Sequence, residues 1–86
     1  MKKNNINTYN MFIMGKRKGQ SKFKALQMSK GVQVNNLLYA TIFKSDKLEE
    51  LKPMLNELAT ENKDWTFKIV KAGTSKILYQ TKTNNR

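Results

Sequence analysis

Residues 45–64 have the sequence SDKLEELKPMLNELATENKD, and this stretch decides the fold class because it shows the clearest helical period in the chain. At about 100° per residue, its apolar side chains fall within one stripe, bordered by Met54. The stripe contains Leu48, Leu51, Leu55, Leu58 and Ala59. The opposite side carries Asp46, Glu50, Glu57 and Glu61. The pattern predicts an amphipathic helix that buries its leucines against a sheet.

This helix has a start signal and one complication. Asp46 is a good N-cap residue, and Glu49 three positions later makes the pair resemble a capping box. Pro53 removes a backbone donor, at a cost of about 3 kcal/mol in a helix interior. Because the leucine stripe keeps its phase across Pro53, we expect one kinked helix that continues to about Asn62. Two alternatives stay open: a one-turn helix that stops at Lys52, or a helix that starts with Pro53.

Both flanks of the helix predict β-strands. After it, apolar and polar residues alternate at 65–70 and 77–81 around a turn at 72–74, which is typical of a β-hairpin. Before it, turn residues separate four apolar or alternating runs. Strands are therefore predicted at 9–14, 21–28, 32–34 and 37–44. The last run is the clearest candidate for a buried strand, since it is rich in Leu, Tyr, Thr, Ile and Phe.

The order of elements, β-β-(β)-β-α-β-β, predicts an α+β domain. We expect a mainly antiparallel sheet of four to five strands, with the amphipathic helix packed on one face. The 86 residues make one small domain. We place this domain at 9–82, between a flexible N-terminal tail (1–8) and a flexible C-terminal tail (83–86).

The charged residues are segregated along the chain. All six acidic residues lie between Asp46 and Asp64, whereas most of the 17 Lys and Arg lie outside that window, and the net charge is +11. Such a basic body favours association with polyanions, nucleic acid first and acidic protein surfaces next. The acidic side of the helix has two interpretations: a solvated face, or a docking surface for a basic partner.

The composition gives little support to catalysis. The chain has no Cys and no His, so it lacks thiolate ligands, the commonest general base and the commonest metal ligand. Its carboxylates lie on or just after one helix, mostly on the outer side, and not in a shared cleft. We expect a protein that is not an enzyme and that takes no cofactor and no metal.

The chain also gives little support to a membrane role. The first three residues, Met1-Lys2-Lys3, resemble the start of a signal peptide, but residues 4–7 are polar where an apolar stretch should follow. The longest fully apolar run, residues 11–14, is far too short to span a bilayer. We expect a cytoplasmic protein with no membrane partner.

The segment 15–20 begins Gly-Lys-Arg-Lys-Gly and is a candidate phosphate-binding loop. It does not fit a nucleotide-binding P-loop, because the glycine spacing is wrong, no Gly-Lys-Ser/Thr follows and the next segment predicts a strand. Two interpretations stay open. The segment is a solvated hairpin loop, or Lys16, Arg17 and Lys18 neutralise nucleic-acid phosphates without contacting a base.

A second candidate surface lies on the sheet. One helix covers only one face, so the other face must be polar or paired. Lysines that alternate with apolar residues, and two rings on one side of the 37–44 strand, are candidates for that face. They are Lys22, Lys24, Lys68, Lys76, Tyr39 and Phe43. Rings with lysines on an open sheet suit single-strand binding; alternatively the rings, like Trp65 and Phe67, belong to the core.

The sequence therefore favours a non-catalytic nucleic-acid-binding module that acts through a basic sheet face and the loop at 15–20. The alternative is a protein-interaction or inhibitory module. Such a module docks on an acidic protein, or self-associates through an uncovered sheet face or edge. We expect a monomer or a homodimer.

In general character the chain is similar to small uncharacterised accessory proteins of phages, plasmids and conjugative elements of low-GC Gram-positive bacteria. The resemblance rests on the size, the abundance of Lys and Asn, the Gly-Lys-Arg-Lys-Gly loop at 15–19 and the Leu-Leu-Tyr-Ala-Thr-Ile-Phe strand at 37–43. It implies a bacterial or mobile-element origin and transfers no site residue.

Overall fold

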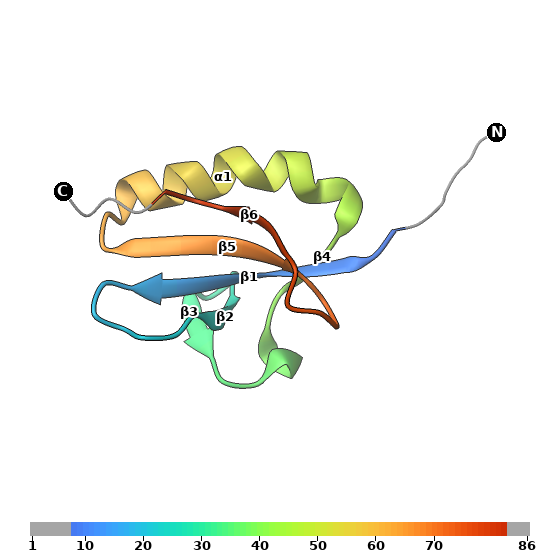
Figure 1. Cartoon of the computed structure of the whole chain (residues 1–86), viewed down its shortest axis with the longest axis horizontal. Coiled ribbons are helices and arrows are strands. Elements are labelled where there is room, and N and C mark those ends of the chain that lie inside the picture. Colours follow the sequence, from blue (N-terminus) through green and yellow to red (C-terminus); the bar gives the residue numbers. More distant parts are fainter. Residues whose placement is uncertain (1–7, 83–86) are drawn as a thin grey trace.

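The computed structural model describes residues 8–82 and shows an antiparallel sheet with helix α1 packed against it (Figure 1). The strands are β1 (Asn10–Arg17), β2 (Lys24–Gln27), β3 (Val32–Val34), β4 (Ile42–Lys44), β5 (Trp65–Lys71) and β6 (Ile77–Gln80). The helical elements are α1 (Leu48–Glu61) and the 3-10 turns η1 (Leu37–Tyr39) and η2 (Ser45–Lys47). The predicted α+β class is confirmed. Residues 1–7 and 83–86 of the predicted tails lie outside the described residues.

Strand β1 is the centre of the sheet. The strand order is β3-β2-β1-β5-β6, and β4 also pairs with β1. Along one edge, residues 11–17 of β1 pair with the whole of β5. The other edge is shared, because β4 pairs with residues 10–12 and β2 with residues 14–15. The register of β1 therefore determines which side chains of β1, β2, β4 and β5 come together.

Side chains alternate between the two faces of this sheet, and directly paired residues share a face. On the helix face, buried residues of the strands pack on the leucine stripe of α1. This core contains Met11, Ile13, Leu26, Phe67 and Ile69 from the sheet, with Leu51, Leu55 and Ala59 from α1. The opposite side, called here the far face, carries a smaller buried cluster of Phe12, Ala25 and Val70. One strand thus supplies two separate apolar clusters.

Helix α1 follows the predicted leucine stripe. Leu51, Leu55 and Ala59 are buried, and the helix runs without a break through Pro53, which is exposed. The two alternatives that split the helix at this proline are wrong. The fold tolerates Pro53 because its ring faces solvent and the leucines on both sides of it reach the same core.

The helix does not begin as predicted. Neither η2 nor α1 has a side-chain cap, so Asp46 and Glu49 form no capping box. Ser45 instead accepts a hydrogen bond through Oγ from the Tyr9 backbone N–H at 3.1 Å, and the Ser45 N–H donates to the Tyr9 carbonyl at 2.9 Å. The chain therefore enters the helix tied to the start of β1.

The segment 37–44, predicted as a buried strand, is mostly not one. Leu37–Tyr39 form η1, and only Ile42–Lys44 pair with β1. Strand β2 occupies the edge of β1 beyond residue 12, so residues 37–41 have no free strand edge to pair with. The Asn36 side chain accepts a hydrogen bond from the Leu38 N–H at 2.9 Å and stabilises the turn instead.

The predicted turn at 15–19 lies further along the chain, at residues 18–23 between β1 and β2. Strand β1 continues to Arg17, and the turn contains Gly19 at φ 98°, a backbone conformation that favours glycine. Gly15 lies inside the strand for a different reason. A Cβ there would lie 3.1 Å from the Trp65 ring and 3.1 Å from Leu26 Cδ1. The missing side chain thus makes room for the indole on the helix face.

Within residues 8–82 the structure contains no helix that is both long enough and apolar enough to cross a bilayer. The β5–β6 hairpin and strand β3 lie where the sequence predicts them.

Candidate functional site

Two lysines from neighbouring strands converge on one aromatic ring of the far face. Lys68 on β5 pairs with Met14, and Lys16 on β1 pairs with Thr66, so both side chains belong to the far face. The Lys68 Nζ lies 4.2 Å and the Lys16 Nζ 5.3 Å from the centroid of the Phe23 ring. All three side chains are half-buried. We call Lys16, Phe23 and Lys68 the lysine cluster.

A pair of glutamines holds the loop that carries Phe23. Gln20 Oε1 accepts hydrogen bonds from the Arg17 N–H at 2.8 Å and from Gln33 Nε2 at 2.9 Å. Gln33 Nε2 also donates to the Gly15 carbonyl at 3.0 Å. The loop is therefore attached both to β1 and to β3, which fixes the approach of Phe23 to the two strands.

The remaining basic residues of the prediction are divided between the two faces. Lys18 and Lys22 are exposed in the loop that carries Phe23. Arg17 pairs with Trp65 and Lys24 pairs with Gly15, so both belong to the helix face. Lys76 is exposed at the distant β5–β6 turn. The structure thus brings together Lys16 and Lys68, leaves Lys18 and Lys22 exposed in the loop that carries Phe23, and does not bring Lys24 or Lys76 to that surface.

The two rings predicted for the same face are separated. Phe43 pairs with Met11 and packs against the helix-face core, so the core alternative is correct for this ring and its place beside the lysines is wrong. Tyr39 lies on η1 and is 61% exposed. Trp65 and Phe67 stack on each other with centroids 5.8 Å apart. Their predicted place in the core is confirmed for Phe67, which is buried.

Sequence reasoning missed Phe23, the residue at the centre of the cluster. Its signal was present, because Phe23 stands between Lys22 and Lys24 in an alternating run. The missing information was the partner, since Lys16 and Lys68 are 52 positions apart and meet only through the β1–β5 register.

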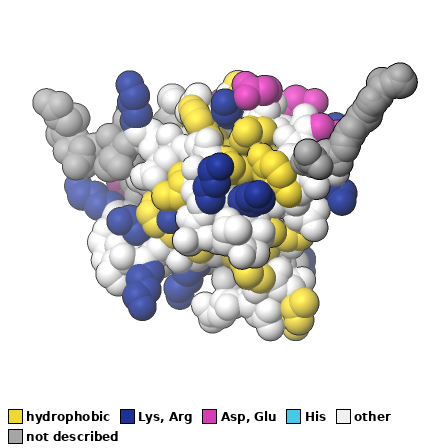
Figure 2. Space-filling view, turned by 45° about the vertical axis from the view of Figure 1, so that its right-hand side comes forward, with side chains coloured by type: hydrophobic (Ala, Val, Ile, Leu, Met, Phe, Trp, Pro, Cys, Tyr) yellow, Lys and Arg dark blue, Asp and Glu magenta, His cyan; other side chains and the backbone are white. Residues whose placement is uncertain are grey.

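The acidic residues gather in the helical region, whereas the basic residues are spread over both faces of the sheet and its loops. In Figure 2 the acidic side chains gather mainly at the top, over α1, and the basic ones lie mainly below them. Both ion pairs found among residues 8–82 lie within the helical region, Lys52 with Glu49 at 2.9 Å and Lys47 with Glu50 at 3.9 Å. No carboxylate in that part of the chain pairs with Lys16 or Lys68. The cations of the far face are therefore available to an external anion.

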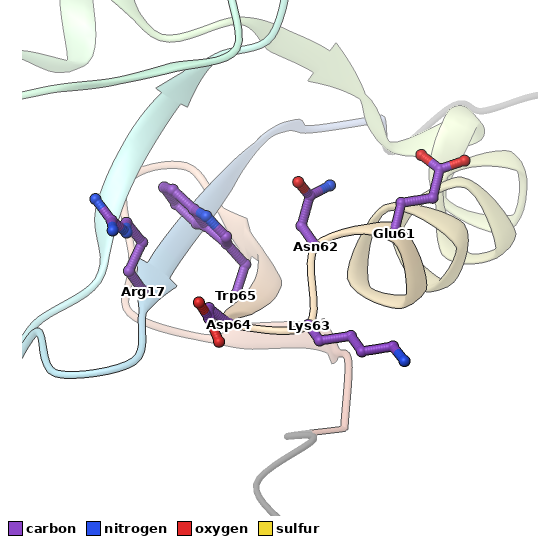
Figure 3. A pocket seen from close by; sticks show the side chains of 6 residues that line it. All are labelled: Arg17, Glu61, Asn62, Lys63, Asp64 and Trp65. Carbon is purple, nitrogen blue, oxygen red and sulfur yellow. The ribbon is translucent and has the colours of Figure 1, made fainter.

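A hollow of about 480 Å³ lies where α1 meets β5 (Figure 3). It is lined by Arg17, Glu61, Asn62, Lys63, Asp64 and Trp65. Figure 3 shows the Trp65 ring standing between Arg17 and Asn62, while Lys63 points away from them. Two acids offset the two cations here, so this hollow favours a polyanion less than the lysine cluster does.

Comparisons with known proteins give no relative to argue from. No family model matches the chain, no curated protein matches its sequence and no solved structure matches its fold. Among residues 8–82 there is also no group of three or more His, Cys, Asp or Glu side chains placed to hold a metal ion.

Proposed function

We propose that the protein is a non-catalytic nucleic-acid-binding module and that the lysine cluster is the centre of its contact surface. The observation that carries the proposal is the convergence of Lys16 and Lys68 on Phe23, on the face opposite the acidic helix. Lys18 and Lys22, exposed in the loop that carries Phe23, are further candidate phosphate contacts. Arg17, though predicted for this role, faces the other side of the sheet.

The electrostatics of the cluster favour a phosphate ligand. Both ammonium groups approach the same ring, and no carboxylate among residues 8–82 pairs with either of them. Phosphates bound at Lys16 and Lys68 add an attraction to each of these uncompensated cations. Contacts of this type release counterions and carry no sequence information, so binding is salt-dependent and non-specific in sequence.

A salt-titrated binding assay with labelled single-stranded DNA, duplex DNA and RNA tests the proposal. The informative variant is Lys16→Gln/Lys68→Gln. Its matched control is Lys47→Gln/Lys63→Gln, which removes the same charge from exposed positions on the acidic side. If two phosphate contacts are lost, the slope of log affinity against log salt falls by about 1.4 to 1.8 in the first variant. The control changes the slope much less.

Two results contradict the proposal. The first is that the wild-type protein binds none of the three nucleic acids at low salt. The second is that both double variants lose the same affinity, because binding then follows net charge and not the lysine cluster.

A further inference from the structure

The turn η1 displays three apolar side chains to solvent. Leu38 is 84% exposed, Tyr39 61% and Leu37 53%. Exposed apolar residues that stand alone are common on proteins, whereas a contiguous group of large ones marks a contact surface. Figure 1 shows this turn at the bottom of the molecule, opposite α1. We call Leu37, Leu38 and Tyr39 the apolar tip.

The apolar tip is held in place by the backbone. The Tyr39 N–H donates to the Asn36 carbonyl at 2.9 Å, and the Thr41 N–H donates to the Leu26 carbonyl at 3.1 Å. Asn36 adds its side-chain bond to the Leu38 N–H. The tip therefore presents its side chains from a turn that is fixed at both ends, which reduces the conformational entropy lost on binding.

The apolar tip lies on the same face as the lysine cluster. Ala40, the residue after it, packs against the buried far-face cluster that contains Phe12 and Val70. Val70 lies two residues along β5 from Lys68, which is about 7 Å in an extended strand. The base of the tip and the lysine cluster therefore belong to the same face of the sheet.

The register of β1 places two cations, Lys44 and Lys68, on either side of Ile42 on the far face. Lys44 pairs with Asn10, the half-exposed Ile42 pairs with Phe12, and Lys68 pairs with Met14. Successive positions on one face of β1 are about 7 Å apart. The far face therefore carries a cation, an apolar position and two further cations in a row, the last being Lys16.

This row matches an unpaired strand better than a duplex. An unpaired strand offers base faces and phosphates together, and proteins bind it with rings, apolar side chains and lysines on one surface. A duplex hides its base faces in the stack and presents phosphates and base edges. A second copy that docked through the same face would bring two basic surfaces together, so charge complementarity favours the polyanion over a two-fold contact through this face.

We infer that the ligand of the far face is single-stranded nucleic acid, with Leu38 and Tyr39 contacting bases and with Lys44, Lys68 and Lys16 contacting phosphates. This inference rests on the proposed function. It adds two things to that function, the class of nucleic acid and the base contacts made by η1. The phosphate contacts of the lysine cluster require neither of them.

The test measures fluorescence anisotropy of the full chain with a labelled unstructured oligonucleotide and with a duplex hairpin of equal charge. Tyr39→Ala and Leu38→Ala are compared with Val32→Ala, an exposed apolar control that lies on the same face but outside η1, on the edge strand β3. We expect Tyr39→Ala to lower single-strand affinity about tenfold, since one base stacked on a ring contributes a factor of this order. Duplex affinity and the salt slope should stay unchanged, as should affinity in Val32→Ala. Circular dichroism confirms that each variant is folded.

Four outcomes overturn the inference in distinguishable ways. Equal binding of both probes, with Tyr39→Ala unaffected, removes the single-strand assignment and leaves the proposed function intact. Absence of binding to either probe at low salt removes both. Tighter binding to phosphatidylserine vesicles that is lost in Leu38→Ala identifies the apolar tip as a lipid contact. A concentration-dependent mass that Leu38→Ala abolishes assigns the tip to a second copy of the chain.

Discussion

The two faces of the sheet differ in what covers them. The helix face is closed by α1, and its core residues Met11, Ile13, Leu55 and Ile69 are completely buried. The far face has a smaller core beneath the segment that contains Ala40, and beyond it the half-buried lysine cluster. Alternate residues of β1 supply both faces. One face is therefore built for stability, and the other keeps charge and apolar surface in contact with solvent.

The largest expected effect comes from two neighbouring residues of β1 that face opposite ways. Ile13→Ala removes a completely buried side chain from the helix face and should cost about 2–5 kcal/mol of unfolding free energy. Met14→Ala truncates a half-buried side chain on the far face and should cost about 1 kcal/mol, because less surface is lost from contact. Urea unfolding measures both. Equal losses would show that the two faces contribute equally to stability.

The next effect concerns the space over Gly15. A Cβ at this position lies 3.1 Å from the Trp65 ring and from Leu26 Cδ1, so Gly15→Ala should cost about 1–3 kcal/mol through overpacking. The shift of the indole should change Trp65 fluorescence in the folded state. Gly19→Ala is the control, because it strains the backbone at φ 98° but contacts nothing within 4 Å. An unaltered Trp65 emission in Gly15→Ala would contradict the packing role of the glycine.

A smaller effect is expected on the far face from Phe23. Phe23→Leu keeps an apolar side chain but removes the ring that Lys16 and Lys68 approach, and should cost about 1 kcal/mol from two cation–π contacts. The same change made in the Lys16→Gln/Lys68→Gln background should cost less, since the cations are absent. This double-mutant cycle isolates the interaction. An equal cost in both backgrounds would mean that Phe23 acts only by packing.

These comparisons also show which parts of the structure local sequence can predict. The leucine stripe of α1 and the alternation in β5 and β6 are periodicities of one segment, and both gave the correct element. The run at 37–44 has equally strong strand composition, yet its first residues form η1 because β2 already occupies the edge of β1. Competition for a strand edge is not encoded in the segment that loses it.

The candidate site was predicted in part for the same reason. Lys16 and Lys68 were recognisable as basic strand or loop residues, but their meeting at Phe23 depends on the β1–β5 register and on the Gln20–Gln33 pair. The alternation of Ile42 and Phe43 predicts that they face opposite ways, but not that the Phe43 side meets the helix, because that depends on pairing with Met11 and Phe12. The composition of one segment can be read from its own sequence, whereas a site also requires the register between strands that are distant in the sequence.

The smallest predicted effect tests a local signal that the structure does not use. Asp46 and Glu49 match a capping box in sequence, but neither η2 nor α1 has a side-chain cap, and Ser45 binds the Tyr9 N–H instead. Asp46→Ala should therefore change the unfolding free energy by less than about 0.5 kcal/mol, below the usual cost of a lost cap. Ser45→Ala should cost about 1 kcal/mol, because it removes the bond that joins the start of the helix to β1. Thermal unfolding of the two variants, measured side by side, tests this prediction. A larger loss of stability in Asp46→Ala than in Ser45→Ala would show that Asp46 caps the helix, and that the bond between Ser45 and Tyr9 contributes less than the cap.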